Sequence, residues 1–93
     1  MKYINTMRAK LVSLRLPWPV CPTDQLCIEP EPENKYDSNA LKVLVNDSGA
    51  WRMAGYVDSD AAALLKGKSL TSVRALTAGD GTFVPIEILL KDG

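Results

Sequence analysis

The sequence predicts a mainly β fold, a six-stranded OB-like small barrel with one short helix after strand four, and it allows a helical turn in the polar segment before the third strand. Two observations favour it: six short apolar segments separated by turn residues, and a slip in the alternation within the first of them. Apolar residues there hold first odd and then even positions: Met7, Ala9, Leu11, then Val12, Leu14, Leu16. A one-residue slip indicates a bulge or bend, which closed barrels need. A small α+β sheet packed by the helix is the alternative.

Strands are expected at residues 7–16, 26–28, 41–46, 50–57, 70–77 and 82–90. Residues 17–22 hold three prolines and form a rigid loop between the first two strands. The third and fourth strands alternate apolar and polar residues around Asn46-Asp47-Ser48-Gly49, a hairpin turn. A second turn, Ala78-Gly79-Asp80-Gly81, joins the last two strands.

The helix is expected over Ala61–Leu65. Asp58 or Ser59 can cap its start, because short polar side chains accept hydrogen bonds from the first free amides. Gly67 ends it, since glycine adopts the left-handed conformation that commonly follows a helix.

The composition limits the classes of function that the chain can have. With 93 residues, the chain is expected to be a single domain over 1–93. Eleven basic and eleven acidic residues cancel, which excludes nucleic-acid binding by bulk charge but not a local basic face. No histidine is present, and two cysteines alone cannot hold zinc. We therefore expect no enzyme, no metal and no cofactor.

The same composition predicts the compartment. Cys21 and Cys27 are expected to be reduced thiols in a cytoplasmic protein. The N-terminus lacks the apolar run of a signal peptide, and no segment is apolar and long enough to span a membrane.

A polar segment before the third strand concentrates Asn, Asp and Tyr side chains. By physics alone, a structural turn explains it, because Asn and Asp bond nearby backbone amides. The full segment, however, resembles the signature of the HIRAN domain family: Glu31-Pro32-Glu33-Asn34-Lys35-Tyr36-Asp37-Ser38-Asn39-Ala40-Leu41-Lys42-Val43. Gly55-Tyr56-Val57, followed by the helix, is similar to the family's next conserved step.

The resemblance implies a modified OB-like barrel found in fork-remodelling helicases and in stand-alone bacterial and phage proteins. It implies a non-enzymatic module that binds the 3′-hydroxyl end of single-stranded DNA in repair or replication-fork processing. Tyr36 would stack on the terminal base, Asp37 would accept a hydrogen bond from the 3′-hydroxyl, and Asn34 would lie beside them. Phe83, whose parity is wrong for the core, would contact a second base; packing at the barrel rim is the alternative.

Departures from the family pattern matter for the ligand. Lys35 replaces the usual proline and adds a positive charge to the site. Arg15 matches a DNA contact but has no aromatic neighbour unless Trp18 supplies one. Asp58 and Asp60 would repel a phosphate backbone at the helix start.

The rival function is a protein–protein interaction module that keeps the barrel and has lost DNA binding, with a helicase or nuclease as partner. A basic groove around Tyr36 would favour DNA, and a neutral or acidic one the rival. We further expect Tyr36 and Asp37 at the surface beside Phe83, and the Asn39 side chain tying the loop backbone together.

Overall fold

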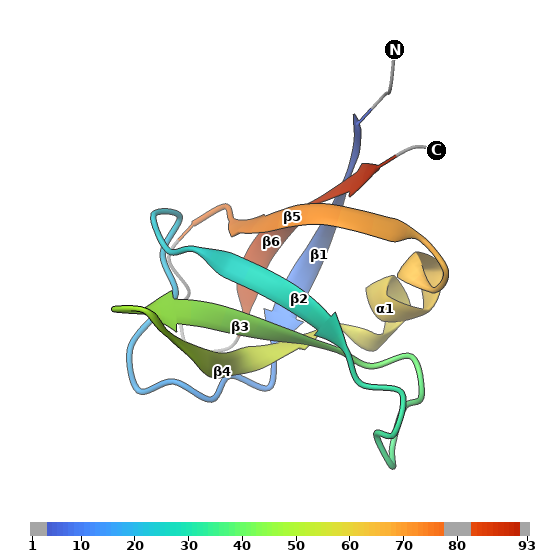
Figure 1. The fold of residues 1–93 in the computed structure, drawn as a ribbon, viewed down its shortest axis with the longest axis horizontal. Coiled ribbons are helices and arrows are strands. Elements are labelled where there is room, and N and C mark those ends of the chain that lie inside the picture. The colour runs from blue at the N-terminus through green and yellow to red at the C-terminus, as the bar shows by residue number, and fades with distance from the viewer. Residues whose placement is uncertain (1–3, 78–82, 92–93) are drawn as a thin grey trace.

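Six antiparallel strands close into a barrel in the order β1-β4-β3-β2-β5-β6, with β6 pairing back to β1 (Figure 1). The structure is a computed structural model that describes residues 4–77 and 83–91. The elements are β1 Ile4–Val12, β2 Leu26–Pro30, β3 Leu41–Asp47, β4 Ala50–Val57, α1 Ser59–Leu65, β5 Ser69–Ala75 and β6 Val84–Lys91. The predicted mainly β barrel with one helix after the fourth strand is confirmed. The predicted turn at 78–81 lies outside the described residues, as does Thr82.

The slip in the first strand corresponds to a sharp bend. β1 ends at Val12, four residues earlier than predicted, because Ser13 takes a left-handed conformation with φ of 53°. The chain then turns, and the Arg15 amide donates a 3.0 Å hydrogen bond to the carbonyl of Ala54. Leu14 and Leu16 pack against the core from this new direction. Leu11 therefore contacts the core from strand β1, and Leu14 and Leu16 contact it from the loop that follows.

β1 and β4 approach closely where the barrel narrows. They share only the pairs Leu11–Val57 and Val12–Tyr56. A Cβ on Gly55 would lie 2.5 Å from the Val12 carbonyl oxygen, which leaves no room for a side chain. A register shift between β3 and β4 beside this point bends β4 towards β1.

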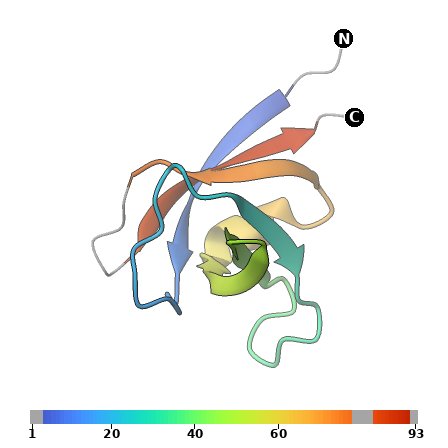
Figure 2. The ribbon, with the colours of Figure 1, turned by 60° about the vertical axis from the view of Figure 1, so that its left-hand side comes forward.

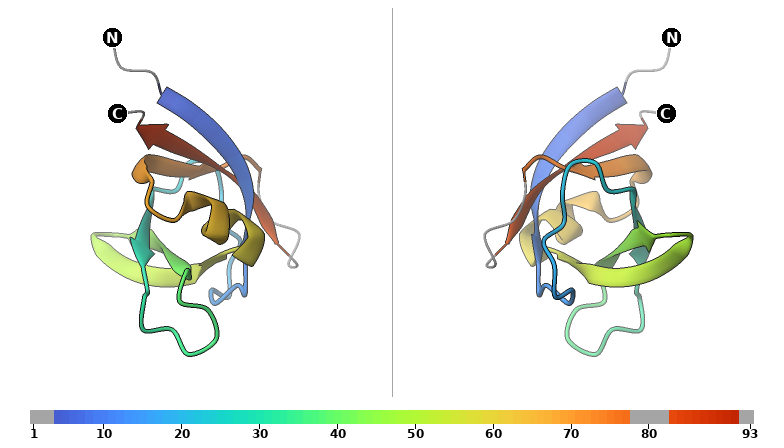
Figure 3. Two further views of the ribbon diagram at one scale, coloured as in Figure 1. Left: turned by 90° about the vertical axis from the view of Figure 1, so that its right-hand side faces the viewer. Right: turned by 90° about the vertical axis from the view of Figure 1, so that its left-hand side faces the viewer.

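The helix α1 lies across one end of the barrel (Figure 3). Its cap is Asp58, which accepts a 3.3 Å hydrogen bond from the Ala61 amide and a 2.8 Å bond from the Lys10 amide. The cap thus joins the helix to β1. Ala61, Ala62 and Leu65 are buried, and the small side chains of the two alanines let the helix pack close to the barrel. No helix in the part of the chain described here has the length and apolar character needed to cross a membrane.

The core fills the barrel with aliphatic side chains; Leu11, Val43, Val84, Ile86 and Ile88 are essentially inaccessible to solvent. In β6, the buried residues alternate with partly exposed ones, as its pattern predicted. Loop 31–40, between β2 and β3, projects from the barrel at the end where α1 lies (Figure 2). This loop carries the signature segment.

Candidate functional site

Loop 31–40 is built from two β-turns, and the helical turn that the sequence allows in this segment does not form. The Asn34 amide donates to the Glu31 carbonyl (3.1 Å), and the Ala40 amide donates to the Asp37 carbonyl (3.0 Å). At the base, the Glu31 amide donates a 2.9 Å bond to the Ala40 carbonyl and closes the loop. Between the two turns, side-chain oxygens accept the hydrogen bonds of backbone amides, so the turns do not merge into a helix.

Asn34 supplies most of those side-chain bonds. Its Oδ1 accepts hydrogen bonds from the amides of Tyr36 (2.8 Å) and Asp37 (3.0 Å), and its Nδ2 donates to Glu31 Oε1 (2.8 Å). Asp37 Oδ1 then accepts a 2.9 Å bond from the Asn39 amide. The side-chain role expected of Asn39 therefore falls to Asn34 and Asp37, and Asn39 contributes its backbone.

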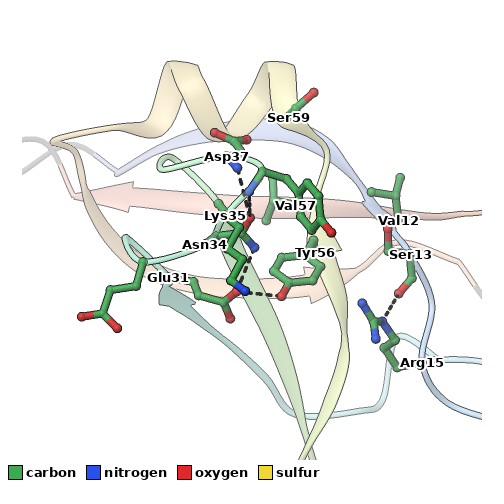
Figure 4. Close-up of a pocket in the computed structure, with 13 residues that line it drawn as sticks. Val12, Ser13, Arg15, Glu31, Asn34, Lys35, Asp37, Tyr56, Val57 and Ser59 are labelled. Atoms are coloured by element: carbon green, nitrogen blue, oxygen red, sulfur yellow. Dashed lines mark hydrogen bonds between the residues drawn. The ribbon is translucent and has the colours of Figure 1, made fainter.

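Tyr56 of β4 anchors the loop to the barrel. Its hydroxyl donates a 2.8 Å hydrogen bond to Glu31 Oε1, the oxygen that also accepts from Asn34 (Figure 4). The hydrogen bonds from Asn34 and Tyr56 lower the pKa of Glu31, because they stabilise the carboxylate. The same bond to Glu31 raises the pKa of Tyr56, because it needs the phenol proton.

A cavity of about 610 Å³ opens between the loop, β4 and the end of β1, and Tyr36 and Asp37 both line it. The Tyr36 side chain is 97% exposed, so its ring is free on both faces. Asp37 uses Oδ1 within the loop, and its Oδ2 makes no hydrogen bond to any residue that the structure describes. The cavity therefore presents an unoccupied aromatic face beside a free acceptor.

Arg15 and Lys35 are the cations of this cavity. The Arg15 guanidinium carbon lies 5.9 Å from the centroid of the Tyr56 ring, and its Nε donates to the Ser13 carbonyl (Figure 4). Its terminal nitrogens face solvent, as does the exposed Lys35. Against these two cations stand the carboxylates of Glu31, Glu33 and Asp37. The cavity is mixed in charge and is not a basic groove.

Phe83 does not line this cavity. It directly precedes Val84, which pairs with Leu11, so it lies next to the end of β1 where Val12 forms part of the cavity wall. Its ring is half-buried, with Lys10 Nζ 5.1 Å from the centroid. The structure thus brings Tyr36, Asp37, Asn34, Lys35 and Arg15 together, and leaves Phe83 beside them rather than among them.

Two other expectations are altered by the contacts. Trp18 lies in the proline-rich loop and lines a separate apolar cavity, so it is not a second ring for Arg15. Asp58 is half-buried, and its carboxylate accepts hydrogen bonds from two backbone amides, which reduces its repulsion of an approaching phosphate. The exposed carboxylate at the helix start is Asp60.

Sequence reasoning gave Tyr56 and Glu31 no part in the site. Gly55-Tyr56-Val57 was noted only as a conserved step, and Glu31 only as the acidic start of the signature. A hydrogen bond between residues in β4 and in the loop has no local sequence signal.

The described residues hold no group of His, Cys, Asp and Glu side chains that could bind a metal ion. The fold and the site together define a small OB-like binding domain, in which a clamped loop presents an aromatic ring and a carboxylate. The HIRAN domain family model matches residues 4–71, and the chain belongs to this family. HIRAN domains are nucleic-acid-binding domains. No curated protein and no solved structure matches the chain.

Proposed function

We propose that this domain binds the 3′-hydroxyl end of single-stranded DNA in the loop 31–40 cavity, without chemical conversion, in DNA repair or replication-fork processing. The observation that carries the proposal is the pairing of a fully exposed Tyr36 ring with the free Oδ2 of Asp37 on a loop clamped by Asn34. Membership of a nucleic-acid-binding family supports the choice of ligand.

Each group suits one part of a strand end. The Tyr36 ring offers a stacking face, which tolerates any base because every base has a π-face. The Asp37 carboxylate accepts a hydrogen bond from a free hydroxyl and repels a terminal phosphate. Asn34 acts as a positioning residue, since its amide group is engaged within the loop.

Phosphate contacts fall to Arg15 and Lys35. Arg15 uses one of its five N–H donors on the Ser13 carbonyl, which leaves the terminal nitrogens for a phosphate oxygen. Phe83, beside the cavity, suits the base of a preceding nucleotide. With two cations and three carboxylates in the lining, few phosphates are neutralised, so we expect weak binding with a shallow salt dependence.

The charge balance also favours a second candidate, a protein-interaction module. A lining with more carboxylates than cations suits a polypeptide with basic residues at least as well as a polyanion. The free, half-buried thiols of Cys21 and Cys27 suit the cytoplasm for either function.

The test is a comparison of linear and circular single-stranded DNA of the same sequence. Fluorescence anisotropy should detect binding of the linear oligonucleotide at low salt and much weaker binding of the circle, which has no end. The oligonucleotide should be recovered intact. Equal binding of both forms contradicts end recognition, and binding of neither leaves the protein-interaction function as the better account.

A further inference from the structure

The seam between β2 and β5 is where the fewest residue pairs close the barrel within the described part of the chain. These strands share the single residue pair Leu26–Val73 and diverge beyond it. Two adjoining cavities of about 400 Å³ each follow the seam, and Ile28 and Leu70 line both of them. The two cavities make up a groove that extends from the Leu26–Val73 pair to the end of α1.

The cavity nearer α1 is separate from the Tyr36 cavity, and Ala40 of loop 31–40 lines both. Its wall is aliphatic, with Leu41, Leu65 and Leu70 among the lining residues. Lys66 and Lys68, both exposed, lie at its edge, and none of its described lining residues carries a carboxylate. Glu29 on β2 forms an ion pair with Lys42, with 3.6 Å between Oε2 and Nζ. At the opposite end of the groove, Asp24 accepts a bond from the Cys21 amide.

Asn39 connects this cavity to the signature segment. Its side chain is not engaged in the hydrogen bonds that hold the loop, and with Ser38 it lines the α1 cavity. The two residues provide donors and acceptors at the edge of an aliphatic pocket. This gives Asn39 a role at the surface in place of the loop-tying role predicted from the sequence.

We infer that the seam docks an extended acidic segment of a partner protein, with an aliphatic side chain in the α1 cavity and carboxylates against Lys66 and Lys68. The charge of the rim selects an acidic partner. Among the residues that the structure describes, the lining has no aromatic or Arg side chain, the groups that stack nucleobases, which argues against a nucleotide. The two cavities beside loop 31–40 thus suit different ligands.

The shape of the groove fits an extended chain. Alternate side chains of a strand point the same way, so an apolar residue can enter the cavity while its acidic neighbours stay at the rim. Leu64 on α1, 64% exposed, adds apolar surface near the lysines.

The experiment is a titration of the ¹⁵N-labelled full chain with a short peptide of alternating glutamate and leucine, followed by amide chemical shifts. We expect shifts at residues of the α1 cavity and none at Tyr36. Charge reversal in a double variant, Lys66→Glu with Lys68→Glu, should weaken peptide binding by about tenfold, because two exposed ion pairs are lost. The matched control, Arg8→Glu with Lys10→Glu on β1, changes the charge equally and should leave the affinity close to that of the unmodified chain.

Three outcomes overturn the inference. These are no shifts at millimolar peptide, equal weakening by both double variants, and shifts at these amides caused by a deoxynucleotide but not by the peptide. A peptide with serine in place of leucine should bind more weakly, because the apolar anchor is missing. The inference is independent of DNA binding: Tyr36→Ala should leave peptide affinity unchanged, so the two sites can fail separately.

Discussion

The hydroxyl of Tyr56 donates a 2.8 Å hydrogen bond to Oε1 of Glu31, a residue 25 positions earlier in the chain. Because Asn34 donates to the same oxygen, one carboxylate joins the barrel wall to the side chain that shapes loop 31–40. The position of Tyr36 and Asp37 therefore depends on Tyr56 and Glu31, which we do not expect to touch a ligand.

The Glu31 carboxylate should make stability depend on pH in the acid range. Its pKa is lowered in the folded state by Asn34 and Tyr56, so its stabilisation is present above the ordinary value of about 4.3 and is lost as pH falls through the folded pKa. Glu31→Gln keeps an acceptor but does not titrate. Urea midpoints measured across acidic pH should show a smaller decline for this variant; the same decline as in the unmodified chain would contradict the role of Glu31.

Tyr56 should make stability depend on pH in the alkaline range. Its pKa is raised by the hydrogen bond to Glu31, so its stabilisation is present below about pH 10 and is lost as pH rises through the folded pKa. Tyr56→Phe should be less stable at neutral pH and should lack this alkaline loss. Thermal unfolding against pH would measure both effects, and an unchanged alkaline profile would exclude the bond.

Asn34→Ala should loosen the loop without affecting the barrel core. Three hydrogen bonds are lost, each worth about 0.5–1.5 kcal/mol in net terms, so we expect about 1.5–4.5 kcal/mol of destabilisation. Hydrogen exchange should speed up at the Tyr36 and Asp37 amides and stay slow in β6. Protection that persists at those two amides would show that Asn34 does not hold them.

Gly55→Ala tests the close approach of β1 and β4. A Cβ there would lie 2.5 Å from the Val12 carbonyl oxygen, so one strand must shift, at a cost of about 1–3 kcal/mol. Gly49→Asn is the comparison: nothing lies within 4 Å of an added Cβ, so only the strain of a backbone with φ of 95° opposes the side chain, and Asn adopts positive φ more readily than most residues. Denaturant midpoints should fall for the first variant much more than for the second.

Tyr36→Ala should weaken binding of single-stranded DNA by about 1–3 kcal/mol regardless of the terminal base. Stability should not change, since the side chain is 97% exposed. Tyr36→Phe keeps the ring and should bind nearly as well as the unmodified chain. Anisotropy titrations with four oligonucleotides that differ in the last base measure this, and a loss confined to one base would argue for edge recognition instead of stacking.

The elements of the fold could be predicted because their signals are local. Alternation in β6, the Asp58 cap and the Ser48-Gly49 turn each depend on a few neighbouring residues. The slip after Leu11 predicted a bend, but not that Ser13 would end the strand there.

The site was harder to predict from the sequence. Whether a residue holds an odd or an even position shows which side of a strand it occupies, but not which loop lies above it. Phe83 faces away from the core as predicted, yet it contacts Lys10 and lies outside the Tyr36 cavity. The loop-tying role predicted for Asn39 is filled by Asn34 for a similar reason. Both can bond backbone amides, and only the course of the loop determines which one does.

The most direct test of the central proposal is a titration with two oligonucleotides that are identical except for a 3′-hydroxyl or a 3′-phosphate. The free Oδ2 of Asp37 should accept from the hydroxyl and repel the phosphate, so the hydroxyl end should bind more tightly. Asp37→Asn removes the charge and should narrow the difference. Equal affinity of the unmodified domain for both ends would contradict recognition of the 3′-hydroxyl by this loop.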